Sequence, residues 1–369
     1  MKVVGVVGCG AISDIYFTNM IGRFGNLQVT SCASKGMASA RKKAELYGLK
    51  PVTMEEMFDD PQIDIIVNLT PPSEHYRIIK AALEHGKHVY TEKVITPDFR
   101  QAQELAALAD RKQRLLCSAP DAFLGAAIQT VKKAVMDGTI GMVSTVNVAL
   151  NRDIELLAEL FRFTIAPGAG VGYDMGIYYL TALLSILGPV REVAGRVRTN
   201  RPTRQFTDPA NPDSGKSYTI ENENVMTGLL DFVGGTQGTV CLNTDSIFPS
   251  DSVMTLYGTK GILYVTDPNE FGGTVRLRRS MAEETEELAV EFDYTDNARG
   301  LGVAEMAYAL EQGQRPRTDR EMGIHAIEIL DGIVASSHSG RFIKMESTFA
   351  VPELMPHNAA TLLGGEVTA

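Results

Sequence analysis

The sequence predicts an α/β protein with two domains, an N-terminal parallel sheet with helices on both faces and a C-terminal α/β domain with an open, mainly antiparallel sheet. The chain has 369 residues, which is long for one domain. Strand-like and helix-like segments alternate from Met1 to about Pro120, which is typical of a parallel sheet. After Asp121, strand-like segments follow one another with hairpin turns. We therefore divide the chain into domains at 1–120 and 121–369.

In the first domain, short runs of β-branched residues predict buried strands, and the segments between them read as helices. The predicted strands are 2–7, 27–34, 63–70, 87–90 and 114–119, and the predicted helices are 11–24, 37–48, 73–86 and 98–113. Parallel sheets bind ligands outside the carboxyl ends of their strands, so residues at those ends are the first candidates for a site.

In the second domain, one helix is followed by a series of strands and then by two late helices. The predicted strands are 142–150, 191–199, 224–233, 238–244, 252–257, 261–266 and 274–278, and the predicted helices are 125–141, 302–313 and 319–338. The polar segment 199–216 is predicted to be a loop or an excursion over the surface.

Composition narrows the class of protein. The net charge of −10 argues against nucleic acid or an anionic membrane as the main partner. The four cysteines are far apart and form no CxxC pair, so we expect reduced thiols and no metal site or disulfide framework. The N-terminal apolar run is too short for a signal peptide or membrane span, so we expect a soluble, cytoplasmic protein.

The segment "VVGVVGCGAIS" predicts a dinucleotide site. Gly8 and Gly10 follow the first strand and precede a helix that begins near Ala11 and Ile12. Gly8 permits a tight turn, and Gly10 lets a pyrophosphate approach the backbone and the helix N-terminus. The third position of the fingerprint holds Ser13 instead of Gly or Ala.

The end of the second strand bears on which nucleotide binds. The segment "CASKGMASARKK" has no acidic residue to accept hydrogen bonds from a ribose 2′-hydroxyl. Ser34 and Lys35 could hold a 2′-phosphate instead, which favours NADP over NAD. The alternative is a solvated basic helix face without a ligand.

The segment "NLTPPSEHY" follows the third main strand and is predicted to form a loop beside the cofactor. The residues that we assign to this contact are Thr70, Pro71, Pro72 and His75. His75 begins the next helix, and a capping or packing role is the simpler interpretation of it than catalysis.

The order of "GCGAIS", "TPPSEH", "GKHVYTEK" and "GAGVGYDMGIYYLTALLSILGPV" resembles the glucose–fructose oxidoreductase/inositol dehydrogenase family, Gfo/Idh/MocA, up to about residue 340. The resemblance implies a Rossmann domain at 1–120 and a substrate-binding and oligomerisation domain at 121–369. It also implies hydride transfer between a nicotinamide and a sugar, polyol or related carbinol. The open sheet of such proteins is commonly an oligomer interface, so a homodimer or homotetramer is expected.

The family motif Glu-Lys-Pro corresponds to Glu92, Lys93 and Val94, so proline is replaced. The resemblance implies that Glu92 and Lys93 lie at the cofactor and that Lys93 lies beside the carbinol. A cation there would stabilise an alkoxide. We expect desolvation and the positive nicotinamide ring to lower the pKa of Lys93 and let it relay a proton.

The family often carries Asp-x-x-x-His, and here the segment has Asp174 and Tyr178, which we expect on one face of a helix. Three interpretations remain open. In the first, Tyr178 is the acid or base, with a phenol pKa lowered by Lys93 and the nicotinamide. In the second, Lys93 alone relays the proton and Tyr178 binds substrate. In the third, Tyr178 only packs and the site has lost dehydrogenase chemistry. Asn151 and Arg162 are predicted to bind substrate hydroxyls.

The sequence therefore predicts an NAD(P)-dependent oxidoreductase acting on a secondary alcohol of a sugar, glycoside or polyol, with C3 of a pyranose as one specific guess. Two alternatives are weighed against it. One is a redox-neutral enzyme that keeps its cofactor and catalyses hydrolysis, elimination or epimerisation of a glycoside. The other is a non-catalytic nucleotide-binding sensor.

Overall fold

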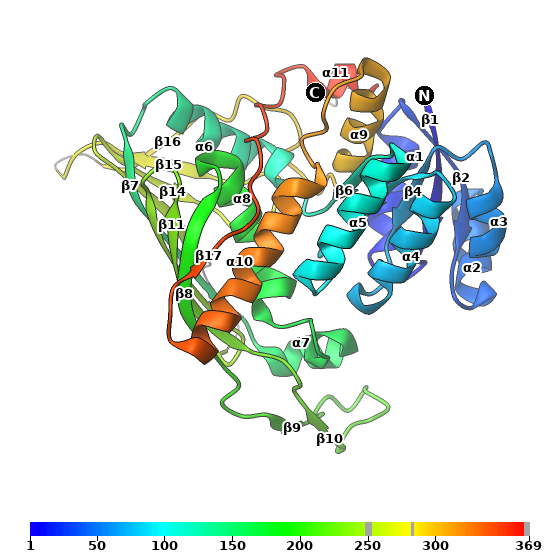
Figure 1. Ribbon diagram of the computed structural model, residues 1–369, viewed down its shortest axis with the longest axis horizontal. Coiled ribbons are helices and arrows are strands. Elements are labelled where there is room, and N and C mark those ends of the chain that lie inside the picture. Colours follow the sequence, from blue (N-terminus) through cyan, green and yellow to red (C-terminus); the bar gives the residue numbers. More distant parts are fainter. Residues whose placement is uncertain (248–252, 282–283, 365–369) are drawn as a thin grey trace.

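The computed structural model describes residues 1–247, 253–281 and 284–364. The N-terminal part is a six-stranded, fully parallel sheet in the order β3-β2-β1-β4-β5-β6, with helices packed around it (Figure 1). Its strands are β1 (Lys2–Val7), β2 (Leu27–Ala33), β3 (Lys50–Pro51), β4 (Ile65–Asn68), β5 (His88–Thr91) and β6 (Leu116–Ser118). Its helices are α1 (Ser13–Gly22), α2 (Met37–Tyr47), α3 (Met54–Asp59), α4 (Pro72–Glu84) and α5 (Phe99–Lys112).

The predicted elements of this domain are confirmed, and their ends differ from the observed ones by at most two residues. The short strand β3 and helix α3 were not predicted. Helix α3 begins with a capping box, in which the Thr53 side chain accepts from the Glu56 amide and the Glu56 carboxylate accepts from the Thr53 amide. The sequence T-x-x-E carries that signal, so this helix start was readable.

The C-terminal part contains a nine-stranded sheet in the order β16-β15-β14-β13-β7-β12-β11-β8-β17. Only the pair β7–β12 is parallel, which agrees with the predicted mainly antiparallel sheet. The strands are β7 (Val143–Asn151), β8 (Val190–Arg198), β11 (Val225–Phe232), β12 (Gln237–Asn243), β13 (Val253–Gly258), β14 (Ile262–Val265), β15 (Val275–Arg278), β16 (Glu286–Glu287) and β17 (Ile343–Lys344). The strand predicted at 252–257 is β13, and residue 252 lies outside the described residues.

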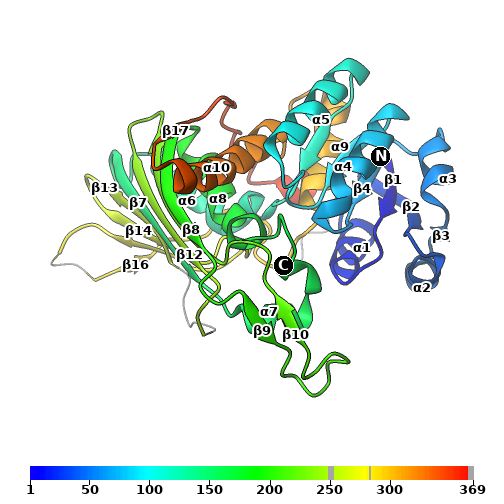
Figure 2. The ribbon, with the colours of Figure 1, turned by 60° about the horizontal axis from the view of Figure 1, so that its bottom comes forward.

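Helices cover one face of this sheet and leave the other face open (Figure 2). The elements of this part are the α-helices α6 (Ala126–Met136), α8 (Ile177–Leu187) and α10 (Arg320–Ser339), the 3₁₀ turns η1 (Ala122–Leu124) and η2 (Arg162–Ile165), and the π-helical turn η3 (Gly172–Gly176). Exposure alternates along β11 and β12, because every second side chain points into the core under the helices.

The last part of the chain returns to the first domain. Helix α9 (Leu301–Gln312) lies beside α1, and α11 (Ala359–Leu362) lies near the same end of the molecule (Figure 1). The Asn19 amide donates to the carbonyl oxygens of Asn297 and Arg299 at 2.9 and 2.8 Å. The two domains are therefore joined by more than the single connection near residue 120, and the boundary at 120/121 stays a prediction.

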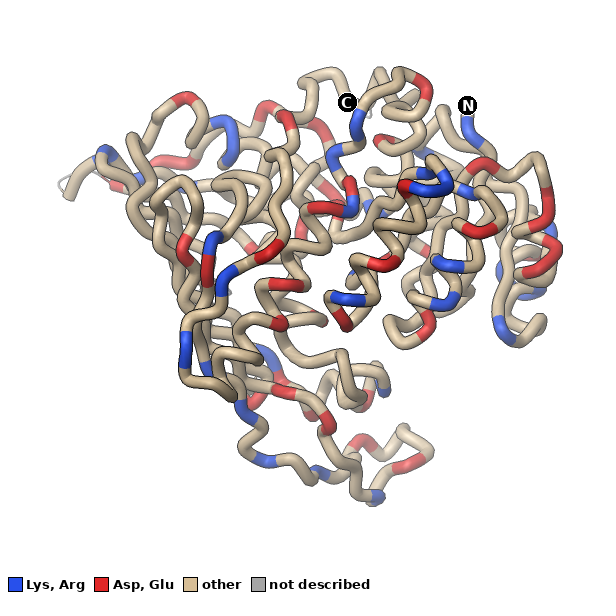
Figure 3. The backbone as a smooth tube through the Cα atoms, viewed as in Figure 1, with Lys and Arg blue, Asp and Glu red and all other residues tan. Residues whose placement is uncertain are grey.

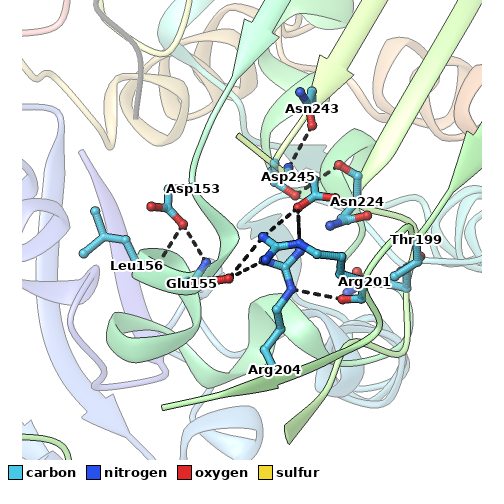
Figure 4. A network of polar contacts seen from close by, with 11 residues as sticks. Asp153, Glu155, Leu156, Thr199, Arg201, Arg204, Asn224, Asn243 and Asp245 are labelled. Carbon is cyan, nitrogen blue, oxygen red and sulfur yellow. Dashed lines mark hydrogen bonds and ion pairs between the residues drawn. The ribbon is translucent and has the colours of Figure 1, made fainter. Parts of the chain in front are cut away.

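Residues 199–219, here named the arm, project from the edge of the sheet against α7 (Ile154–Leu160). The segment 199–216, predicted as a loop or a surface excursion, holds strand β9 (Thr203–Gln205), which pairs with β10 (Ser217–Thr219) just after it. A buried guanidinium fastens this hairpin (Figure 4). Arg204 donates to Glu155 at 2.5 Å and to Asp245 at 2.6 Å, with only 4% of its side chain exposed. Phe206 and Tyr218 add a small apolar core with α7.

Lysine and arginine are interspersed with aspartate and glutamate in both domains (Figure 3). The net negative charge is therefore not gathered on one element. Among the described helices, none has the length and apolar character that crossing a bilayer requires.

Candidate active site

The glycine-rich turn after β1 has the geometry expected for a dinucleotide. Gly8 has φ +108°, and a Cβ there would lie 2.6 Å from the carbonyl carbon of Leu69 at the end of β4. Its amide donates to the Ala33 carbonyl at 2.9 Å, which ties the turn to β2. Only glycine fits this left-handed conformation against a neighbouring backbone.

The following residues leave an open approach to the start of α1. A Cβ on Gly10 would meet no described atom within 4 Å, and Ala11 and Ile12 are exposed. Ile12 at the N-cap position provides no side-chain acceptor, so amides of the first turn are available to an anion. Ser13, the departure from the fingerprint, donates to the Gly10 carbonyl at 2.6 Å and is buried, so it stabilises the turn.

At the end of β2, small hydroxyl groups gather where the ribose of a dinucleotide lies in a Rossmann fold. Ser39 donates to Ser34 at 2.8 Å, and Ser34 donates to the Gly36 carbonyl at 2.6 Å. Lys35 is exposed beside them. The nearest acid upstream, Asp14, is engaged by Lys43 and by the Tyr47 hydroxyl on α2.

The loop after β4 is tied to the segment that carries Lys93. His75 is fully buried, and its Nδ1 and Nε2 lie 2.6 Å from the Val94 carbonyl and 2.7 Å from the Thr70 carbonyl. Burial lowers the pKa of His75. Pro71 and Pro72 stand at the N-cap and first position of α4, where proline is favoured. His75 thus joins two cofactor-side loops, and a direct cofactor contact by it stays a prediction.

Glu92 and Lys93 follow β5 and reach in different directions. Glu92 is buried and accepts from the Tyr16 hydroxyl at 2.8 Å and from the Lys93 amide at 2.9 Å. The Lys93 ammonium points to the other domain, where it donates to both the carboxylate and the backbone carbonyl of Asp174 at 2.6 Å. The peptide bond from Lys93 to Val94 is cis.

This ion pair corrects the expected direction of the lysine pKa. Burial by itself lowers the pKa of Lys93, but the negative charges of Asp174, of Glu92 and, once it ionises at high pH, of Tyr178 outweigh burial and raise it above its ordinary value. The side chains of Lys93 and Asp174 are only 14% and 12% exposed, so water screens the pair weakly. In the protein alone, Lys93 is therefore a cation at neutral pH.

Asp174 lies on the π-helical turn η3 and not on the regular helix that the sequence predicted. The wider turn lies close to helix α10 and to strand β12, since a Cβ on Gly172 would be 2.7 Å from Leu330 of α10 and one on Gly176 would be 2.4 Å from Leu242 of β12. Small residues are needed there for that reason. Asp174 and Tyr178 nevertheless meet at one point, the Lys93 ammonium.

Tyr178 is the second residue of α8 and is 8% exposed. Its ring centroid lies 5.4 Å from the Lys93 ammonium and 6.0 Å from the Arg299 guanidinium carbon. Burial raises the pKa of Tyr178, with a further rise from the charge of Glu92, and the cations Lys93 and Arg299 offset part of that rise. The expectation of a lowered phenol pKa is therefore wrong for the protein alone, and Tyr178 is a protonated phenol at neutral pH.

Arg299 is a member of the site that sequence reasoning missed. It comes from the loop before α9, in an "NARG" segment that carries no recognisable motif. Its guanidinium donates to the side-chain oxygens of Asn269 at 2.6 Å and Asn297 at 2.8 Å. Only the folded arrangement of the second domain brings it to Tyr178.

The two predicted substrate ligands, Asn151 and Arg162, have different surroundings. Asn151 ends β7 and accepts from Asn243 at 3.2 Å. Arg162 contacts Asn211 and Asp213 of the arm and stacks 3.9 Å from the Phe206 ring centroid. Both have protein partners, and their contact with substrate stays a prediction.

Comparison with known proteins agrees with this geometry. Residues 2–119 match the model of an oxidoreductase family with an NAD-binding Rossmann fold, and residues 128–264 match the GFO/IDH/MocA C-terminal domain. The chain is 30% identical, over 76% of its length and 81% of the relative, to dTDP-3,4-didehydro-2,6-dideoxy-α-D-glucose 3-reductase of Streptomyces antibioticus. It is 23% identical, over 93% and 96%, to the NADP⁺-dependent scyllo-inositol 2-dehydrogenase IolW of Bacillus subtilis.

Other curated relatives match over about half of their own length. The solved aldose-aldose oxidoreductase of Caulobacter crescentus has the same fold, with a TM-score of 0.79 at 19% identity over 93% of this chain and 99% of that one. The glycine turn, the lysine after β5 and both family matches lead to one conclusion: the chain belongs to the Gfo/Idh/MocA family of NAD(P)-binding oxidoreductases.

Proposed function

We propose that this protein transfers hydride between NADP or NAD and a secondary alcohol, or its ketone, of a sugar, glycoside or polyol. One observation carries the proposal: the Lys93 ammonium, at the carboxyl end of the parallel sheet, is bonded to Asp174 and faces Tyr178 of the second domain. The relatives named above as a sugar 3-reductase and an inositol 2-dehydrogenase support this substrate class.

Each residue has a role that follows from its contacts. Lys93 is a hydrogen-bond donor placed to stabilise negative charge on the substrate oxygen as a carbonyl becomes an alkoxide. Asp174 holds the ammonium in position through two contacts of 2.6 Å. The nicotinamide, when bound, supplies or accepts the hydride. Tyr178, as a protonated phenol, is suited to donate a hydrogen bond or a proton to the same oxygen.

The cofactor is held by the glycine turn and the ends of the strands. Gly8, Gly10 and the first turn of α1 would receive the pyrophosphate. Ser34, Ser39 and Lys35 would receive a 2′-phosphate, and the charge of Asp14 is offset by its ion pair with Lys43. These contacts favour NADP over NAD.

The function is tested by an anaerobic screen of NAD⁺ and NADP⁺ against glucosides, hexoses, inositols and anhydrosugars, and of the reduced cofactors against the matching keto sugars. Absorbance of the reduced nicotinamide reports turnover. Lys93→Met should reduce kcat by about 10²- to 10⁴-fold. Lys80→Met is the matched control, since Lys80 also lies near a tyrosine ring, 5.8 Å from Tyr76, but on α4. No turnover with any carbinol or keto sugar, with the cofactor bound, would contradict the proposal and favour a redox-neutral cycle or a sensor.

We further infer that the helix-free face of the nine-stranded sheet binds a second copy of the chain. Leu229, Tyr257 and Phe342 expose 50%, 38% and 57% of their surface on or beside it. A broad face with exposed apolar side chains is typical of a protein interface. Sedimentation velocity tests this: Leu229→Asp should shift the protein toward the monomer, and Leu46→Asp, an exposed leucine of α2, should not. Equal masses for both variants would refute it.

A further inference from the structure

Arg299 differs from the other poorly exposed arginines of the described structure in what neutralises it. Arg152, Arg204, Arg317 and Arg320 each form an ion pair with a carboxylate. Arg299 forms no ion pair with a carboxylate among the residues that the structure describes. Its nitrogens donate to the neutral side-chain amides of Asn269 and Asn297.

The backbone that carries Arg299 is held firmly. The amides of Gly300 and Gly302 both donate to one carboxylate oxygen of the buried Asp121, at 3.0 and 2.9 Å. On the other side, the backbone amide of Asn269 donates to the Asp267 carboxylate at 3.0 Å. The Asn269 side chain, which accepts from Arg299, is therefore carried by a closed turn. The guanidinium is thus fixed 6.0 Å from the rings of both Tyr178 and Phe271.

The position of Arg299 matters because two cations, Lys93 and Arg299, lie near the Tyr178 ring. The charge of Lys93 lowers the pKa of Tyr178 more than the charge of Arg299 does, and the nearby carboxylate of Glu92 raises it. Lys93 is, however, directly paired with Asp174, whereas Arg299 has no such partner among the described residues.

Arg299 is a cation in a poorly solvated place, and its side-chain hydrogen bonds go to the neutral amides of Asn269 and Asn297. The charge of Asp121 also acts on Arg299, but Asp121 accepts from the backbone amides of Gly300 and Gly302 and forms no ion pair with the guanidinium in the described structure. A guanidinium held by neutral amides keeps more of its charge for a nearby anion than one paired directly with a carboxylate.

We propose that Arg299, fixed by Asn269, is a positioning residue of this site, which orients the Tyr178 hydroxyl and stabilises the phenolate left when Tyr178 gives its proton to the substrate oxygen. The inference rests on the proposed function. In the step, the phenol O–H bond breaks and a new O–H bond forms on the oxygen of the carbonyl that is reduced by the cofactor's hydride. The phenolate then takes a proton from water.

The first test follows ionisation of Tyr178 without turnover. 3-Fluorotyrosine is placed at position 178, and its ¹⁹F chemical shift is recorded against pH in the full chain. Replacing Arg299 by Met should raise the apparent pKa of the label by about one unit or more, since a cation at this range typically shifts a pKa by 1–3 units. Arg299→Lys should give a smaller rise. Arg276→Met, which removes the cation 5.8 Å from the Tyr264 ring on the sheet, is the matched control and should leave the label unchanged.

The second test uses Asn269→Ala, which keeps the Arg299 guanidinium and removes the side-chain oxygen to which it donates. This variant keeps the inference testable if Arg299→Met does not fold. The ¹⁹F titration should shift in the same direction by a smaller amount. In turnover, both variants should lower kcat for ketone reduction and move its pH profile, with the KM for cofactor unchanged.

An unchanged titration in folded Arg299→Met and Arg299→Lys would overturn the inference. A shifted titration in a protein that turns over no carbinol or ketone would support the Arg299–Tyr178 link and place the failure in the proposed function.

Discussion

Replacing Asp174 by Asn should destabilise the protein through Lys93. The ammonium and carboxylate are 2.6 Å apart and mostly buried, so their direct attraction is about 6 kcal/mol at an effective dielectric constant of about 20. Removing one partner of a buried pair typically costs about 3–5 kcal/mol, because the other charge is left uncompensated. The backbone carbonyl of residue 174 still accepts from Lys93, which favours the lower end, about 3 kcal/mol.

Deprotonation of Lys93 sets an upper limit on the stability that Asp174→Asn can lose. Lys93 can lose its proton instead of remaining an unpaired cation, and at pH 7 this costs about 5 kcal/mol relative to an ordinary lysine pKa near 10.4. The smaller value of about 3 kcal/mol is therefore the expected one. The sign with pH follows from the raised pKa of Lys93: the pair stabilises fully below the pKa of the unfolded chain and is lost as pH rises through the higher pKa of the folded protein.

The assay is a double-mutant cycle of Asp174→Asn and Lys93→Met, with free energies of unfolding from urea curves at pH 7. Each single variant should lose about 3 kcal/mol, and the double variant should lose clearly less than the sum, by about 2–3 kcal/mol. Tyrosine absorbance and circular dichroism follow unfolding in this tryptophan-free chain. Additive losses, or a coupling that is unchanged at pH 11, would refute the reasoning.

Three further outcomes are expected. Burial raises the pKa of Asp121 from 3.8 to about 6, so the protein loses stability as pH rises through this window and the carboxyl ionises. Relative to the parent, the free energy of unfolding of Asp121→Asn should therefore rise by up to about 3 kcal/mol between pH 4 and 7, as measured by urea unfolding at both pH values. Ser34→Asp should weaken NADP⁺ binding at least about tenfold and spare NAD⁺, as measured by calorimetric titration of both. Gly8→Ala places a Cβ 2.6 Å from Leu69 at φ +108°, and it should abolish binding of both cofactors in equilibrium dialysis; unaltered binding would contradict the assigned turn.

Much of the first domain could be predicted from the sequence because its signals are local. β-Branched runs, helix periods and terminal glycines lie within each element, and their alternation indicates a parallel sheet. The glycine turn and Lys93 could be placed for the same reason, since each directly follows a strand.

The electrostatics of the site could not be predicted in this way. The direction of the Lys93 pKa depends on a carboxylate from the other domain, and that of Tyr178 depends on burial outweighing two cations. The π-helical turn at Asp174 is favoured by contacts of Gly172 and Gly176 with Leu330 and Leu242, which come from distant segments. The hairpin of the arm is not predicted from the sequence, because the polar segment 199–216 does not reveal that Arg204 is buried.

The replacement of histidine by tyrosine at position 178 fits the rest of the site. An imidazole at that position could serve as a base at neutral pH, but a buried phenol is protonated and suits proton donation. Lys93 and Arg299 are cations beside it, so all three groups stabilise negative charge on an oxygen and none removes a proton readily. Under the proposed function such a set suits reduction of a ketone at neutral pH. A phenol that gives up its proton in a buried site leaves an anion that needs a cation beside it, and Arg299, which is held by neutral amides and forms no ion pair with a carboxylate among the described residues, is placed to be that cation.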